Sequence, residues 1–226
     1  MGLIRKTLGT ALAVAATGGV GYLTATTNLT TPLSADDELW ASKSFKKFNR
    51  HRNPSIQDIC WKSVPLSEVR PELRDNEEAL TTEFCRGAWA GYAYAPQRTI
   101  MSFTNKGPKT ESQLFEQQQL ASSKYELGTR FSDHFEVVER TRNSVMLRGG
   151  GSPLEPGPRE VDGLFVISAK FNKQAGTVDV GLKTVFFNSA EPTGKKPAPF
   201  MVEFLHRYYS RAMVDDGARR LTQQSP

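Results

Sequence analysis

Residues 163–187 decide the fold, and they read GLFVISAKFNKQAGTVDVGLKTVFF. Apolar side chains take every second position over both halves of this stretch: Phe165, Ile167, Ala169, Phe171, Val178, Val180 and Leu182. A period of two residues predicts two strands, each with one buried face. The polar segment Asn172–Gly176 between them predicts that they form an antiparallel hairpin.

Further elements are predicted on both sides of this hairpin. Strands are expected at Ile56–Val64, Tyr125–Arg140 and Ser144–Arg148. Helices are expected from Glu77 to about Ala95, near Ser112–Leu120, and from about Pro199 to Leu221. Pro96 is expected to stop the first of these helices. Small residues between Gly87 and Ala95 would permit close approach of a sheet, another helix or a ligand.

The order of these elements predicts an α+β fold of the helix-grip, START-like type. In this arrangement a curved antiparallel sheet packs on a long C-terminal helix and leaves a cavity between them. The last helix carries an apolar stripe at helical spacing, which we expect to face the sheet while Glu203 and Arg207 face water. We place this domain at residues 55–226.

The N-terminal region is predicted to be a tether. Residues 7–25, TLGTALAVAATGGVGYLTA, carry no charge and follow a basic N-terminus at residues 1–6. This pattern is typical of a single transmembrane helix, with a cleaved secretory signal or a mitochondrial presequence as alternatives. Residues 26–54 are interpreted as a basic linker, either merely solvated or in contact with lipid headgroups.

The charges that flank the predicted transmembrane helix at residues 7–25 predict its orientation in the membrane. The basic flank that follows it predicts a cytosolic main domain, anchored as a single-pass protein in the endoplasmic reticulum, with a mitochondrial membrane as the alternative. Asn28-Leu29-Thr30 is a glycosylation sequon, usable only if that side is luminal.

Composition excludes several functions. Residues 1–52 hold seven of the 29 basic side chains and three of the 24 acidic ones, so residues 53–226 carry 22 basic and 21 acidic residues. A nearly neutral body gives no support for nucleic-acid binding. Two cysteines cannot form a disulfide scaffold. The sequence contains no GxSxG, GxxxxGK[ST] or HExxH motif, and we expect neither a metal site nor a cofactor.

One part of the chain resembles known proteins. The segments YELGTRFSDHFEVVERTRNSVMLRGGGSP, VDGLFVISAKFN, GLKTVFFNS and PFMVEFLHRYYSRAMV are similar to a group of poorly characterised fungal proteins. That group is associated with START-like or polyketide-cyclase-like folds and with natural-product pathways. The resemblance covers roughly residues 55–218 and brings no catalytic motif. It implies a pocket for a lipophilic polyketide or terpenoid, in company with other pathway enzymes.

Three residues are candidate acid–base groups. Asp133 is predicted on the same strand face as Phe131 and Phe135, where an ionised carboxylate is costly to bury. An acid at a strand end, bonded to water or a backbone amide, is the alternative. Glu203 and His206 are three residues apart on a predicted helix and are expected to form a proton-transfer pair or a surface ion pair.

A lipophilic pocket is predicted between the last helix and the sheet. Its lining would comprise Trp89, Tyr92, Phe135, Ile167, Leu182, Met201, Leu205 and Tyr208. Such a pocket favours a cofactor-free cyclase, isomerase or pericyclase, whose catalysis needs a shaped cavity and few polar groups. A non-catalytic lipid or sterol carrier and a structural membrane protein that docks a partner are the alternative functions.

Overall fold

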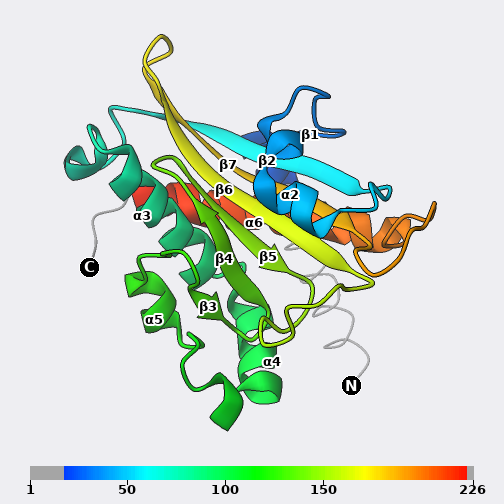
Figure 1. The fold of residues 1–226 in the computed structure, drawn as a ribbon. Coiled ribbons are helices and arrows are strands. Elements are labelled where there is room, and N and C mark those ends of the chain that lie inside the picture. The colour runs from blue at the N-terminus through cyan, green and yellow to red at the C-terminus, as the bar shows by residue number, and fades with distance from the viewer. Residues whose placement is uncertain (1–17, 223–226) are drawn as a thin grey trace, which may run out of the picture.

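The computed structural model describes residues 18–222, which form an α+β fold around one seven-stranded antiparallel sheet (Figure 1). The strand order is β1-β2-β7-β6-β5-β4-β3. The strands are β1 (Asn28–Thr30), β2 (Ile56–Pro65), β3 (Arg130–Phe131), β4 (Phe135–Arg140), β5 (Ser144–Gly149), β6 (Asp162–Asn172) and β7 (Thr177–Phe187). The helices are a helix at 18–26, α2 (Lys43–Phe48), α3 (Glu77–Ala90), α4 (Ala95–Asn105), α5 (Gln117–Ser122) and α6 (Phe200–Thr222). Short 3-10 turns are η1 (Glu38–Ala41), η2 (Pro71–Leu73) and η3 (Pro108–Thr110).

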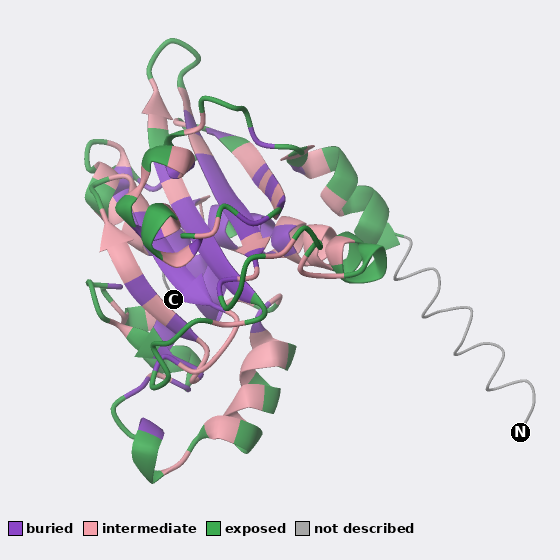
Figure 2. Ribbon diagram, turned by 45° about the vertical axis from the view of Figure 1, so that its right-hand side comes forward, coloured by how far each residue is buried: buried purple, intermediate pink, exposed green. Residues whose placement is uncertain are grey.

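The predicted central hairpin is confirmed as β6 and β7, which pair from Asp162↔Phe187 to Asn172↔Thr177. The two strands are buried on both faces over most of their length, as the purple centre of Figure 2 shows. Phe165 and Ile167 belong to one core cluster, whereas Leu164 and Val166 belong to another. The prediction of a single buried face was therefore incomplete, because elements cover both sides of the sheet.

Two helices, α3 and α6, cover the first face. Asn76 caps α3 by accepting a hydrogen bond from the Ala79 amide, and the helix begins there. A Cβ on Gly87 would lie 2.7 Å from the Cα of Gly217, so the two helices touch at glycine. The small residues of α3 thus serve close packing against another helix.

The opposite face is covered by the segment between β1 and β2. Leu33 and Leu39 are buried there, and Trp40, Phe45 and Phe48 pack against the same cluster. Figure 1 shows α2 in front of the sheet and α6 behind it. Residues 26–54 are therefore not a linker, and the predicted domain boundary at residue 54 is wrong, because the outer sheet face needs an apolar cover. The α2 lysines remain exposed on this side.

Two predictions about the middle of the chain also fail. Pro96 does not stop a helix; it stands in the first turn of α4, where a proline has no hydrogen bond to lose. Most of residues 125–134 is not a strand, since only β3 (Arg130–Phe131) pairs with β4 and a turn follows it. By contrast, β2 and α6 begin and end within about a residue of their predicted bounds.

The predicted membrane anchor lies largely outside the described residues. Its last part is helical, from residue 18 to residue 26, and leads directly into β1. Within residues 18–222, no helix combines the length and the apolar character that crossing a bilayer requires. Asn28 is an exposed residue of β1, paired with Trp61, and its glycosylation stays a prediction.

Candidate functional site

A polar cluster lies between the sheet and the first half of α6. Asp58 of β2 and Thr184 of β7 are direct cross-strand partners, and both are fully buried. Thr184 contacts His206 of α6, which places a chain of three polar side chains across the interface between helix and sheet. Buried polar groups in such a position require hydrogen-bond partners or a functional reason.

The hydrogen bonds in this chain define the tautomer of the histidine. The Thr184 hydroxyl donates to Asp58 Oδ1 at 2.8 Å, and its oxygen lies 2.9 Å from His206 Nε2. A hydroxyl has one hydrogen, so Nε2 must carry the proton that this second bond needs. Nδ1 of His206 is then the unprotonated nitrogen. The hydroxyl of Ser210 also lies 3.1 Å from Nε2.

The second oxygen of Asp58 has no hydrogen-bond partner. Its Oδ2 lies 3.9 Å from Nε of Arg207, and that Nε is also buried without a hydrogen bond. Arg207 instead forms an ion pair with Glu203, one turn earlier in α6. The charge of Asp58 is thus compensated at a distance rather than by direct contact.

Burial changes the proton affinities of this cluster. Desolvation raises the pKa of Asp58 to about 6, against the opposing effects of the Thr184 hydrogen bond and the Arg207 charge. Desolvation also lowers the pKa of His206 to about 4, and the nearby Arg207 lowers it further. Near neutral pH the cluster therefore holds a neutral imidazole beside a carboxylate that is close to its titration range.

Aromatic rings surround the imidazole. The ring of Phe186 lies 4.8 Å from that of His206 in an edge-to-face arrangement, and Phe165 lies 6.5 Å away. Phe186 and His206 are both only partly buried, so the row of polar side chains from Asp58 through Thr184 reaches the surface at His206. The arrangement combines flat apolar walls with one polar ring, as sites for lipophilic molecules do.

The predicted pair of Glu203 and His206 does not form. Both residues lie on α6 as expected, but Glu203 bonds Arg207 and His206 bonds Thr184. Arg207 turns toward the sheet rather than toward water, which reverses the predicted orientation of this helix. The buried residues of α6 are small or lie late in the helix: Ser210, Met213, Val214, Asp215, Gly217, Ala218 and Leu221.

Asp133 lies elsewhere. It occupies the turn between β3 and β4 with φ at 48°, so the two-residue alternation of a strand does not apply to it. Its carboxylate accepts hydrogen bonds from Gln113 Nε2 at 3.0 Å and from the Ser152 hydroxyl at 2.7 Å. These contacts tie two loops together. The prediction that Asp133 lies on the apolar face is wrong, and the alternative of a bonded acid at a strand end fits better.

The eight residues predicted to line a pocket do not come together. Trp89, Phe135, Ile167 and Leu182 are core residues, and the first two pack in a cluster of aromatic rings. Tyr92, Met201 and Leu205 are 88%, 59% and 63% exposed, whereas Tyr208 is half-buried beside Phe204. Large rings fill the interior at close packing, so these residues enclose no common cavity.

One hollow in the described part of the chain, about 1050 Å³, lies beside the start of α3 and the β6–β7 turn, and charges of both signs line it, among them Arg74, Glu77 and Asp179. Within residues 18–222, no three His, Cys, Asp or Glu side chains gather closely enough to hold a metal ion. The His206 cluster is therefore the strongest candidate site.

Asp58 and Thr184 were not predicted as site residues, although the sequence contains one signal for Asp58. Ile56, Asp58 and Cys60 alternate along a predicted strand, so a carboxylate shares a face with apolar residues. The contact with Thr184 depends on sheet register, which joins residues 126 positions apart.

The fold defines the chain as an α+β protein whose seven-stranded antiparallel sheet packs against a long C-terminal helix. Comparison with protein-family models, with curated proteins and with solved structures gave no match.

Proposed function

We propose that this chain is a membrane-anchored helix-grip protein that binds a lipophilic small molecule beside His206 and rearranges it by proton transfer, without a cofactor. The substrate class is a polyketide- or terpenoid-like molecule, and the role is that of a cyclase or isomerase working with other pathway enzymes. A lipid or sterol carrier that uses the same site without chemistry is the second candidate.

The strand order supports the helix-grip assignment. The first long strand, β2, pairs with the last strand, β7, and the other strands follow in reverse sequence order to β3. Helices stand between the first long strand and the remaining strands, and the longest helix closes the chain. Fold alone does not define activity, so the functional proposal depends on the site.

The single observation that carries the proposal is the buried chain from Asp58 through Thr184 to His206. An ionisable carboxyl with one unbonded buried oxygen is costly to keep in a folded protein. Such groups gather at functional sites, where environment shifts their proton affinity. The row of hydrogen-bonded side chains ends at an imidazole between two aromatic rings, and His206 and Phe186 are both partly exposed.

The chemistry follows from the tautomer. His206 Nδ1 takes a proton from a carbon or hydroxyl of the ligand, and the imidazolium formed is stabilised through Nε2–H, the Thr184 hydroxyl and the Asp58 carboxylate. Return of the proton to a different atom of the ligand completes an isomerisation or a ring closure. No electrons are gained or lost, so no oxidant or reductant is needed.

Photolabelling tests binding at this site. Full-length protein in vesicles is irradiated with a diazirine fatty acid, and the labelled residues are mapped by mass spectrometry. We expect label on Phe186 of β7, lost when His206→Trp fills the space. The matched control is His134→Trp, because His134 is a second partly buried histidine whose pKa burial lowers to about 4. Label at Phe186 that is unchanged in both variants contradicts the proposed site.

Deuterium exchange separates the enzyme from the carrier. A long-chain methyl ketone in D₂O exchanges its α-hydrogens slowly, and we expect the protein to accelerate this. Thr184→Val, which breaks the chain at constant shape, should lower the rate about 10²–10⁴-fold. Thr81→Val is the control, since the Thr81 hydroxyl is buried without a partner. Labelling of Phe186 without accelerated exchange supports the carrier and overturns the enzyme.

A further inference from the structure

The first half of α6 carries an exposed apolar face on the side opposite the His206 cluster. Four large side chains at helical spacing form it: Phe200 is 68% exposed, Met201 59%, Phe204 41% and Leu205 63%. Glu203, His206 and Arg207 occupy the other side of the same turns and bond one another or the sheet. These turns are therefore amphipathic, with the apolar side outward.

A second helix, α4, also carries exposed apolar side chains. On α4, Ile100 is 64% exposed and Phe103 86%, one turn apart. The Tyr209 hydroxyl donates to Gln97 Oε1 at 2.8 Å, which joins α4 to α6. Tyr92, just before α4, is 88% exposed. We refer to Phe200, Met201, Phe204 and Leu205 with Ile100 and Phe103 as the α4–α6 face. Exposed apolar surface on this scale marks an interaction site.

The helix at 18–26 is fixed to α6. Arg211 donates to the carbonyls of Leu23 and Thr27 at 3.3 and 2.6 Å. The Tyr22 hydroxyl lies 3.4 Å from Asp215 Oδ1, and the Arg219 guanidinium lies over the Tyr22 ring. In Figure 2 this helix and the start of α6 lie side by side at the right of the molecule, and α4 lies at the bottom. The apolar sequence that precedes residue 18 thus joins the fold on the α6 side.

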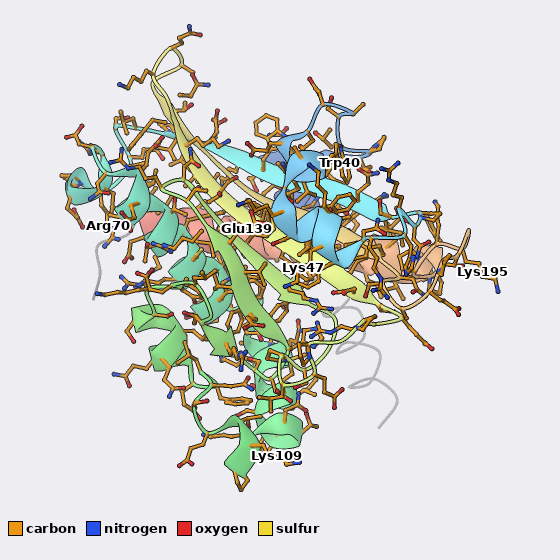
Figure 3. The ribbon with its side chains drawn as sticks, viewed as in Figure 1. Trp40, Lys47, Arg70, Lys109, Glu139 and Lys195 are labelled. Carbon is orange, nitrogen blue, oxygen red and sulfur yellow. The ribbon has the colours of Figure 1, made fainter. Side chains whose placement is uncertain are left out.

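Positive charge borders the same region. Lys195 and Lys196 are exposed in the loop that leads into α6, and Figure 3 shows Lys195 at that end of the molecule. The acid of these first turns, Glu203, is paired with Arg207. Anionic lipid headgroups attract such lysines, while the neighbouring Phe and Leu side chains enter the acyl boundary.

We propose that the α4–α6 face lies in the surface of a lipid bilayer with anionic headgroups. The occupant is lipid rather than another protein because residues 7–17 are uncharged and mostly apolar or small in sequence, and they directly precede the helix at 18–26 that is bonded to α6. The inference rests on the membrane anchoring within the proposed function, not on its chemistry.

The test uses single cysteines in the full-length chain. Cys60 and Cys85 are buried, and burial raises the pKa of their thiols to about 11 and about 12, so added surface cysteines react first. Leu205→Cys and Phe103→Cys report on the α4–α6 face. Gln174→Cys is the control, because it is exposed in the β6–β7 turn at the other end of the sheet (Figure 1).

Each variant is labelled with an environment-sensitive dye and reconstituted into vesicles of phosphatidylserine and brominated phosphatidylcholine. We expect the dyes at 205 and 103 to shift to the blue and lose emission to the brominated acyl chains, consistent with a depth of about 5–10 Å. The dye at 174 should keep its aqueous spectrum.

Three failures are distinguishable. If carbonate extraction releases the protein from the vesicles, the anchor itself is wrong and the inference falls with it. If the protein stays with the vesicles but dyes at 205 and 103 are not quenched, the anchor stands and the proposed bilayer face is overturned. A blue shift without quenching means that protein, such as a second copy of the chain, covers this face, which also overturns the inference.

Discussion

Asp58 and Asp162 lie in the same sheet, and both are fully buried, yet their surroundings differ. Arg148 donates to both oxygens of Asp162 at 3.0 and 2.6 Å, and the Ser189 hydroxyl adds a third bond. Asp58 has a single hydrogen bond, from Thr184, and its other oxygen has none.

The difference separates a structural carboxylate from one suited to chemistry. A fully paired buried charge fixes the elements that hold it, and removing either partner leaves an uncompensated charge. A half-satisfied carboxyl contributes little to stability but is able to change its protonation or stabilise a neighbouring cation. The following variants test this contrast, beginning with the largest expected effect.

Asp162→Asn should lower the free energy of unfolding by about 3–5 kcal/mol, because Arg148 would keep its buried charge without a counter-ion. Chemical denaturation of full-length protein in detergent measures the change. A loss below about 1 kcal/mol would contradict a structural role for the ion pair between Arg148 and Asp162.

Asp58→Asn should have a pH-dependent effect. The folded-state pKa of Asp58 is raised from 3.8 to about 6, so the ionised carboxylate destabilises the fold above that range and the cost disappears as pH falls toward 4. The stability of this variant relative to wild type should therefore increase by up to about 3 kcal/mol between pH 4 and pH 7. A difference that does not vary with pH contradicts the raised pKa.

His206→Gln should gain stability relative to wild type as pH falls, whereas Asp58→Asn gains it as pH rises. Because burial lowers the folded-state pKa of His206 to about 4, the wild-type protein loses stability as pH falls from 6.5 toward that value. The glutamine variant should lose about 2 kcal/mol less over this range. His134→Gln, with the same pKa direction in the loop beside Gly150, should behave alike in stability but leave ligand labelling unchanged.

The smallest expected effect is the difference in stability between Thr184→Val and Thr81→Val. The first leaves Asp58 and His206 without their shared hydroxyl and should cost about 1–3 kcal/mol. The second removes a buried hydroxyl that has no partner and should be neutral or stabilising. Equal losses in thermal denaturation would show that Thr184 does not bridge the two groups.

Local sequence patterns predicted the main strands and helices but not the residues that pack against them. The β6–β7 hairpin and the bounds of α6 followed from alternation and from Pro199, which depend on neighbours in sequence. The predicted orientation of α6 was wrong because its largest apolar residues were taken as core, whereas Gly217 makes the close contact with α3.

The candidate site was predicted only in part. His206 and Glu203 were identified from the helix, but their partners depend on contacts that span the sheet. The packing of Leu33 and Leu39 on the outer sheet face was not predicted for a similar reason. These apolar residues are few within a basic, polar stretch, and their burial depends on contacts with the assembled sheet. Asp133 was misplaced because a turn interrupts the strand pattern.

The most direct test of the account is the carboxyl titration of Asp58 by ¹³C NMR in the full-length protein, with the signal assigned by its loss in Asp58→Asn. We expect a pKa of about 6 that shifts when a long-chain methyl ketone binds beside His206. A carboxyl that titrates near the ordinary value of 3.8 and does not respond to the ketone would contradict it.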